Sequence, residues 1–103
     1  MFAYPTEDEL DAIRNAEGWK PTLALAIAVW DADGVTFNLR PEEQALADAL
    51  TMRDVPGKYV RFATGGWSGN EDIVAALDRN VWAGMSWVLS AAGGLHIYEA
   101  PTS

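Results

Sequence analysis

The chain has 103 residues, half of them hydrophobic, with five tryptophans, no cysteine, a single histidine and a formal net charge of −8. The lack of cysteine excludes disulfides, thiolate nucleophiles and Cys-ligated zinc, and the single imidazole of His96 excludes sites that need two. Because nucleic-acid backbones are bound mainly through Lys and Arg, so acidic a chain is expected not to bind nucleic acid directly.

The acidic residues are concentrated in the first half of the chain. Residues 1–52 carry a net charge of −7, whereas residues 53–103 carry −1. The length predicts one domain spanning residues 1–103. The start of the chain lacks signal-peptide features, and no apolar run is long enough to span a bilayer. We therefore expect a cytoplasmic protein, in a host cell, that needs no membrane and no cofactor.

The first predicted element is a short helix from about residue 7 to residue 16. Thr6 and Glu9 have the spacing of a capping box, in which each side chain bonds the backbone of the other. Leu10 and Ile13 follow at helical spacing.

Residues 21–30 fit two structures. Large apolar residues alternate with alanine as in a strand, but Leu23, Ile27 and Trp30 also share one helical face. The Ala and Leu content favours a helix. We favour a buried helix that ends at Gly34.

A short strand is predicted at residues 35–39, which have β-branched and aromatic residues at period two. A helix follows, with Pro41 at its start and acids in its first turn. Its predicted buried stripe consists of Leu46, Ala49 and Leu50.

The second half is predicted to contain a strand at 59–64, a Gly-rich turn at 65–70 and another helix. Ser68 and Glu71 have the spacing of a second capping box, so the helix should start at Ser68 and reach about Asn80. Arg61, on the strand, is expected to pair with an acid of the first half.

The last elements are predicted to be a hairpin of strands 81–89 and 95–99, closed by Gly93-Gly94. The alternation in 81–89 places Trp87 in the core and Trp82 on the opposite, partly exposed face. The whole pattern predicts an α+β fold, with three or four short helices on a mainly antiparallel sheet of three to four strands.

The run from Thr64 to Ile73, with Trp82, Trp87 and Gly93-Gly94 after it, resembles small uncharacterised proteins encoded by bacteriophages and prophages. The resemblance covers about residues 58–99. It implies a phage setting, and it implies no mechanism because the family has no assigned activity.

Two surfaces are candidates for binding. One is the acidic N-terminal helix, and the other is the Trp-bearing half, because exposed Trp is enriched at binding hot spots. The acidic candidates are Glu7, Asp8 and Asp11, and the candidates of the Trp67/Trp82 region are Trp67, Ser68, Asn70 and Trp82.

Other motifs favour structural interpretations. Asp31, Asp33 and Gly34 do not fit the register of an EF-hand loop, so no metal site is predicted. The Gly-rich turn lacks the Lys of a phosphate-binding loop. His96 can approach Ser86 or Ser90, but a Ser-His pair without a third orienting group is weak support for catalysis.

The sequence thus favours a non-catalytic, phage-type accessory protein that binds another protein, which would be basic or itself bind nucleic acid, and that inhibits a host system. Two alternatives stay open. The protein could be a small-ligand-binding protein or enzyme centred on the Gly-rich turn at residues 65–71. It could also be a phage structural component that self-assembles, if the hairpin edge pairs between chains.

Overall fold

The computed structural model describes residues 4–30 and 34–101, and every structural statement below concerns these residues. The elements are α1 (Glu7–Asn15), α2 (Trp19–Val29), β1 (Val35–Thr36), α3 (Pro41–Leu50), β2 (Tyr59–Ala63), α4 (Ser68–Asp78), α5 (Val81–Ser86), β3 (Trp87–Ala91) and β4 (Leu95–Glu99). These helices and an antiparallel sheet form a small α+β domain, which confirms the predicted fold class.

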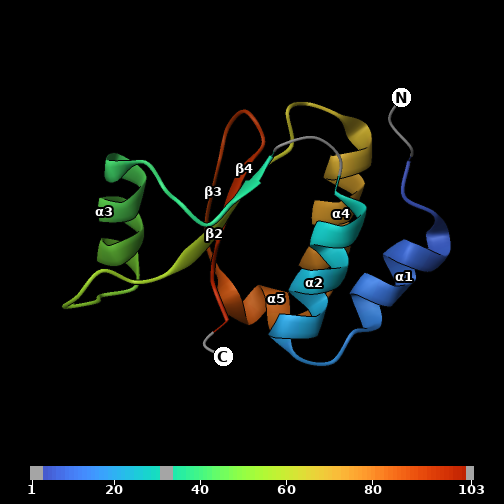
Figure 1. Cartoon of the computed structure of the whole chain (residues 1–103), viewed down its shortest axis with the longest axis horizontal. Coiled ribbons are helices and arrows are strands. Elements are labelled where there is room, and N and C mark those ends of the chain that lie inside the picture. Colours follow the sequence, from blue (N-terminus) through green and yellow to red (C-terminus); the bar gives the residue numbers. More distant parts are fainter. Residues whose placement is uncertain (1–3, 31–33, 102–103) are drawn as a thin grey trace.

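The sheet has the strand order β1-β2-β4-β3, and all neighbouring strands are antiparallel. It stands between α3 on one side and the other helices on the opposite side (Figure 1). Because successive side chains alternate between the faces of a strand, Val60, Phe62 and Tyr98 face the larger helical layer, and Tyr59 and Ile97 face α3.

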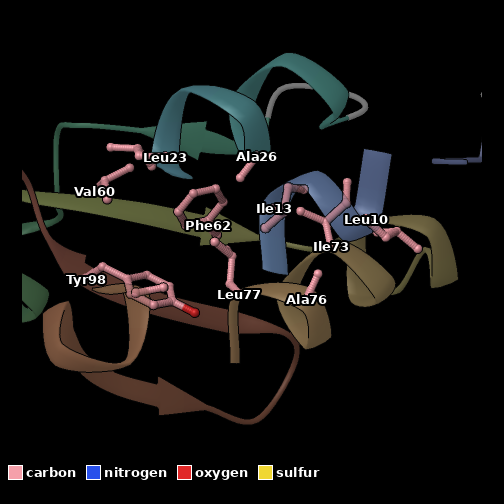
Figure 2. Packing of buried hydrophobic residues seen from close by; sticks show 11 residues of the cluster. Leu10, Ile13, Leu23, Ala26, Val60, Phe62, Ile73, Ala76, Leu77 and Tyr98 are labelled. Atoms are coloured by element: carbon pink, nitrogen blue, oxygen red, sulfur yellow. The ribbon is translucent and has the colours of Figure 1, made fainter. Parts of the chain in front are cut away.

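The main core lies between the sheet and the larger helical layer (Figure 2). Phe62 is central to it, with its ring 4.9 Å from that of Trp30 and 5.7 Å from that of Tyr98. A smaller cluster lies under α3, where Ala47, Tyr59 and Ile97 are buried and partly buried apolar side chains pack against them, namely Leu39, Val88, Leu89 and Leu95. Since burial of a large apolar side chain contributes about 1.5–3 kcal/mol, most of the hydrophobic stabilisation comes from the main core.

The predicted first helix is confirmed, including its cap. The Thr6 hydroxyl accepts a hydrogen bond from the Glu9 N–H at 3.1 Å, and the Glu9 carboxylate accepts one from the Thr6 N–H at 2.8 Å.

Residues 21–30 form a helix, as favoured, but α2 ends at Val29 rather than at Gly34. It is also buried on one side only. Leu23 and Ala26 lie in the core, while Leu25 and Ile27 are exposed. The reason is that α2 covers the sheet as an outer layer, so only one side of the helix, which carries Thr22, Leu23 and Ala26, is buried.

The two elements that follow α2 differ from prediction. The strand predicted at 35–39 contains only Val35–Thr36. The helix at Pro41 is present, but the predicted stripe of Leu46, Ala49 and Leu50 is exposed and α3 buries Ala47 instead.

The prediction of a strand at 81–89 is wrong. Residues Val81–Ser86 form α5, and β3 starts only at Trp87. The side-chain oxygen of Asn80 accepts hydrogen bonds from the N–H groups of Trp82 (2.9 Å) and Ala83 (3.1 Å), and this N-cap starts a helix where the apolar alternation suggested a strand. This helix is the reason that the structure has more helices than predicted.

The two tryptophans of this segment have different outcomes. Trp87, predicted to be core, is 52% exposed, because it lies on β3 at the edge of the sheet. Trp82 is 42% exposed, as predicted.

The hairpin is confirmed, with φ of +90° at Gly93 and +83° at Gly94. None of the helices in residues 4–30 and 34–101 is long and apolar enough to cross a bilayer.

Candidate functional site

The position of α5 is fixed by one buried amide, that of Asn80. Its nitrogen donates hydrogen bonds to the carbonyls of Ile13 (2.8 Å) and Ala16 (3.0 Å), at the end of α1. Its oxygen accepts from Trp82 and Ala83, as described above. Asn80 therefore donates to carbonyls at the end of one helix and accepts from N–H groups at the start of another, where the helices' own hydrogen bonds run out.

The outer side of α5 is apolar and exposed. The helix buries only Ala83, whereas Trp82 is 42% exposed and Met85 74% exposed. Both line a groove of about 610 Å³, which we call the α5 groove. Its other walls come from the start of α2, the segment after α3 and the end of β4, and its main lining residues are Trp19, Lys20, Arg53, Trp82, Met85 and Glu99.

The walls of the α5 groove are held in place by specific contacts. The Trp19 ring nitrogen donates to the Glu99 carbonyl at 2.6 Å, and the Trp19 ring lies 5.4 Å from that of Tyr98. Arg53 forms an ion pair with the Glu99 carboxylate. In the described part of the chain, Lys20 has no ion pair. The groove thus combines exposed apolar anchors with a cation, Lys20, that forms no ion pair within residues 4–30 and 34–101.

The α5 groove continues into a second hollow of about 570 Å³. The two share Lys20 and the C-terminal residues Ala100 and Pro101. The second hollow is lined mainly by apolar side chains, including Ile27 and Phe37, which are both exposed.

The predicted Trp67/Trp82 region is not one surface. Trp67 is the N-cap of α4, and Trp82 lies beyond the other end of that helix. A helix of this length spans about 16 Å. The two tryptophans therefore belong to different ends of the domain.

The Gly-rich turn is organised differently from prediction. Trp67, with an extended backbone, is the N-cap of α4, and Ser68 is already helical and makes no cap bond. Ser68 Oγ instead lies 3.0 Å from the Tyr4 hydroxyl, and the rings of Tyr4 and Trp67 are 5.1 Å apart. A Cβ at Gly69 would collide with the Trp67 ring.

Asn70, the last candidate of that turn, is buried, and its amide nitrogen lies 3.4 Å from the Thr64 carbonyl. A buried side chain with a backbone partner is not presented to a ligand at the surface. In this turn Tyr4, Trp67 and Ser68 contact one another, so these side chains contribute to local packing.

The acidic candidates lie on α1, where Glu7, Asp8 and Asp11 are all exposed, as predicted. Arg14 is close to two of them, with an ion pair to Asp11 and a 3.6 Å contact to Glu7. The α1 surface is therefore acidic but partly neutralised.

His96 forms a polar chain with β3. Its Nδ1 lies 2.8 Å from Ser90 Oγ, which accepts a hydrogen bond from the Trp87 ring nitrogen at 2.9 Å. Burial lowers the pKa of His96, against the opposing charges of Asp78 and Glu71. Among the described residues no hydrogen bond orients the other ring nitrogen. The arrangement matches a structural histidine better than a catalytic one.

A polar network under α3 was not predicted. The Asp48 carboxylate accepts from the Gly57 N–H (2.8 Å) and the Tyr59 hydroxyl (2.7 Å), and Gln44 donates to the Gly57 carbonyl at 3.0 Å. The Gly57 N–H, then the Tyr59 hydroxyl, lower the pKa of Asp48. Gln44 and Asp48 have helical spacing, but no sequence signal identifies their partners across the chain.

The predicted ion pair of Arg61 with an acid of the first half is confirmed. Its partner is Glu43 at 3.1 Å, at the start of α3. Burial raises the pKa of the Glu43 carboxyl, but the hydrogen bond from the Arg40 N–H and the contact with Arg61 outweigh it, so the net shift is downward.

No cluster of three or more potential metal ligands occurs among residues 4–30 and 34–101. Asp31 and Asp33, which sequence analysis considered as a calcium loop, lie outside the described residues.

Comparison with known proteins gave no similarity: no protein-family model, curated protein or solved structure matches the chain.

Proposed function

We propose that the protein is a non-catalytic accessory protein that binds another protein in the α5 groove. The observation that carries this proposal is the exposure of Trp82 and Met85 together on one wall of a groove. Trp and Met are enriched at protein interfaces relative to the rest of the surface, and buried aromatic anchors contribute most of the binding energy.

The rigidity of the groove supports the same proposal. Asn80 fixes the start of α5, and the contacts of Trp19 fix the opposite wall. A surface that is already ordered loses little conformational freedom on binding, so its apolar contacts translate into affinity. An unpartnered anchor on a flexible loop would not have this advantage.

The charges of the groove suggest the chemistry of the bound segment. An apolar side chain of the partner would pack against Trp82 and Met85, and a carboxylate would pair with Lys20. The acidic surface of α1 would act at longer range, by steering a partner with a basic region toward the protein. A phage setting stays a prediction from the resemblance of residues 58–99, and the inhibition of a host system stays a prediction from the acidic charge of the chain.

The proposal can be tested by affinity capture with the immobilised protein in a lysate of the organism that encodes it. A bound protein should be retained by the wild type and lost from the variant Trp82→Ala/Met85→Ala. The matched control is Leu25→Ala, which shortens an exposed apolar residue of α2 outside the groove. Loss of a hot-spot anchor should weaken binding at least tenfold, or about 1.4 kcal/mol.

Capture that is unaffected by Trp82→Ala/Met85→Ala would contradict the use of the α5 groove. If capture is then lost on reversing Glu7, Asp8 and Asp11 to Lys, the acidic surface of α1 is the interface.

A further inference from the structure

Helix α3 carries its apolar side toward solvent. It is attached to the sheet by the polar network of Asp48 and by the ion pair of Glu43 with Arg61. The side chains on its outer side are apolar, with Leu46 51% and Leu50 54% exposed. We call this outer surface the α3 stripe, and it consists of Ala45, Leu46, Ala49 and Leu50.

The residue just beyond the helix enlarges this apolar surface. Met52 has a φ of +55° and is 89% exposed. In residues 4–30 and 34–101 it is the only residue other than glycine with a positive φ. A glycine would relieve the strain of this helix end. An exposed, strained Met at that point is explained if its side chain is used in a contact.

The α3 stripe is complementary to itself. A two-fold axis that passes between Ala47 and Asp48, perpendicular to the helix, would place Leu46 opposite Ala49 of a second copy. The same axis would place Leu50 opposite Ala45 of the second copy. Each large side chain would meet a small one, which is the pattern that lets two surfaces interdigitate. An interface around a two-fold axis requires such self-complementarity.

The charge of the chain is consistent with an apolar contact region. The net charge of −8 makes two copies repel one another, so an uncharged surface such as the α3 stripe is the part that can approach a second copy most closely. Arg53, just beyond the helix, forms an ion pair with Glu99 of its own chain and takes no part in the proposed contact.

We propose that two copies of the chain associate by antiparallel packing of α3 against α3 of the second copy. This proposal does not depend on the proposed function, because α5 lies on the other side of the sheet (Figure 1). Failure of either proposal leaves the other standing.

The first test is the mass in solution, measured by sedimentation equilibrium from micromolar to millimolar protein. The wild type should rise from the monomer mass of 11.2 kDa toward twice that value. Leu46→Glu/Leu50→Glu should stay monomeric with an unchanged circular dichroism spectrum, since both residues are exposed. Val81→Glu, on α5, is the matched control and should associate like the wild type. A wild type that stays monomeric, or a doubly substituted variant that still associates, would overturn the proposal.

The second test uses the absence of cysteine from the chain. Under mild oxidation, Ala45→Cys/Leu50→Cys should form a disulfide-linked dimer, because residues 45 and 50 of opposite copies would face one another. Leu50→Cys alone should not, because its two copies would be offset by about 7.5 Å along the helix, at 1.5 Å per residue, beyond the reach of a disulfide. Equal cross-linking of the single and double variants would exclude the antiparallel register and overturn the proposal, even if Leu46→Glu/Leu50→Glu fails to fold.

Discussion

Replacing the buried Asn80 by alanine should lower the free energy of unfolding much more than replacing an exposed asparagine by alanine. The substitution removes the N-cap of α5, which is worth about 1 kcal/mol. It also removes the donor of the Ala16 carbonyl and leaves the Ile13 carbonyl with only the 3.4 Å hydrogen bond from the Ala16 N–H, and an unsatisfied buried polar group costs about 1–3 kcal/mol. The expected loss in the free energy of unfolding is therefore about 3 kcal/mol, against about 5–15 kcal/mol for a whole domain of this kind.

Urea denaturation followed by tryptophan fluorescence measures this loss. Asn15→Ala is the matched control, because Asn15 makes one exposed hydrogen bond to the Asp11 carbonyl, and it should cost less than about 0.5 kcal/mol. Asn80→Asp separates the two roles of the amide, since it keeps the cap acceptor and loses the donor. A loss for Asn80→Ala no larger than for Asn15→Ala, or full stability of Asn80→Asp, would refute this reasoning.

Three further predictions use the same measurement. Trp87→Ala should cost far less than the roughly 3–5 kcal/mol of a buried Trp, because Trp87 is half exposed; a loss in that range would mean that its side chain is buried. Ser68→Ala should lower the free energy of unfolding by less than about 0.5 kcal/mol, because Ser68 is not the N-cap of α4; a loss near 1 kcal/mol would show that Ser68 does cap the helix. Because the pKa of Asp48 is lower in the folded protein than in the unfolded chain, its contribution is complete above the unfolded pKa and is lost as the pH falls through the folded one. The stability difference between wild type and Asp48→Asn should therefore shrink in acid, and a difference independent of pH would contradict it.

Local signals were sufficient to predict several elements. Some residues determine the backbone conformation only of their immediate neighbours, so their effect can be predicted from the local sequence. Examples are the capping box of Thr6 and Glu9, Pro41 at a helix start and the pair Gly93-Gly94. These signals predicted α1, the start of α3 and the hairpin.

The segment after α4 shows where such reasoning fails. Its apolar alternation fits a strand, but six residues are too few to separate period two from the helical period. Asn80 could have been interpreted as an N-cap from the sequence alone. Its partners Ile13 and Ala16, which hold it in place, are distant in the chain and cannot be inferred from spacing.

The side of α3 that faces the sheet also could not be predicted from the sequence. The existence of the helix was predicted correctly, but the side that faces the sheet depends on the contacts of Asp48 with Tyr59 and of Glu43 with Arg61. Leu46 and Leu50 lie on the opposite side of the helix and stay exposed.

The candidate site was predicted in part. Trp82 is exposed as predicted, but the strand alternation on which that prediction was based is wrong, because Trp82 lies on α5. Its grouping with Trp67 was wrong, because α4 separates the two, and the groove itself is made by Lys20, Arg53 and Glu99 from three distant segments. Only the tertiary fold brings such segments together.

The most direct test of binding in the α5 groove is site-specific photo-cross-linking. Met85 would be replaced by a photoreactive benzoylphenylalanine, and the protein would be irradiated in a lysate of the organism that encodes it. Ala75, exposed on α4 and outside the groove, is the matched control position. The account predicts one discrete adduct from position 85 that is absent from position 75 and is lost when Trp82 is also changed to Ala. Adducts that are the same from both positions, or none from position 85 while position 75 gives one, would contradict it.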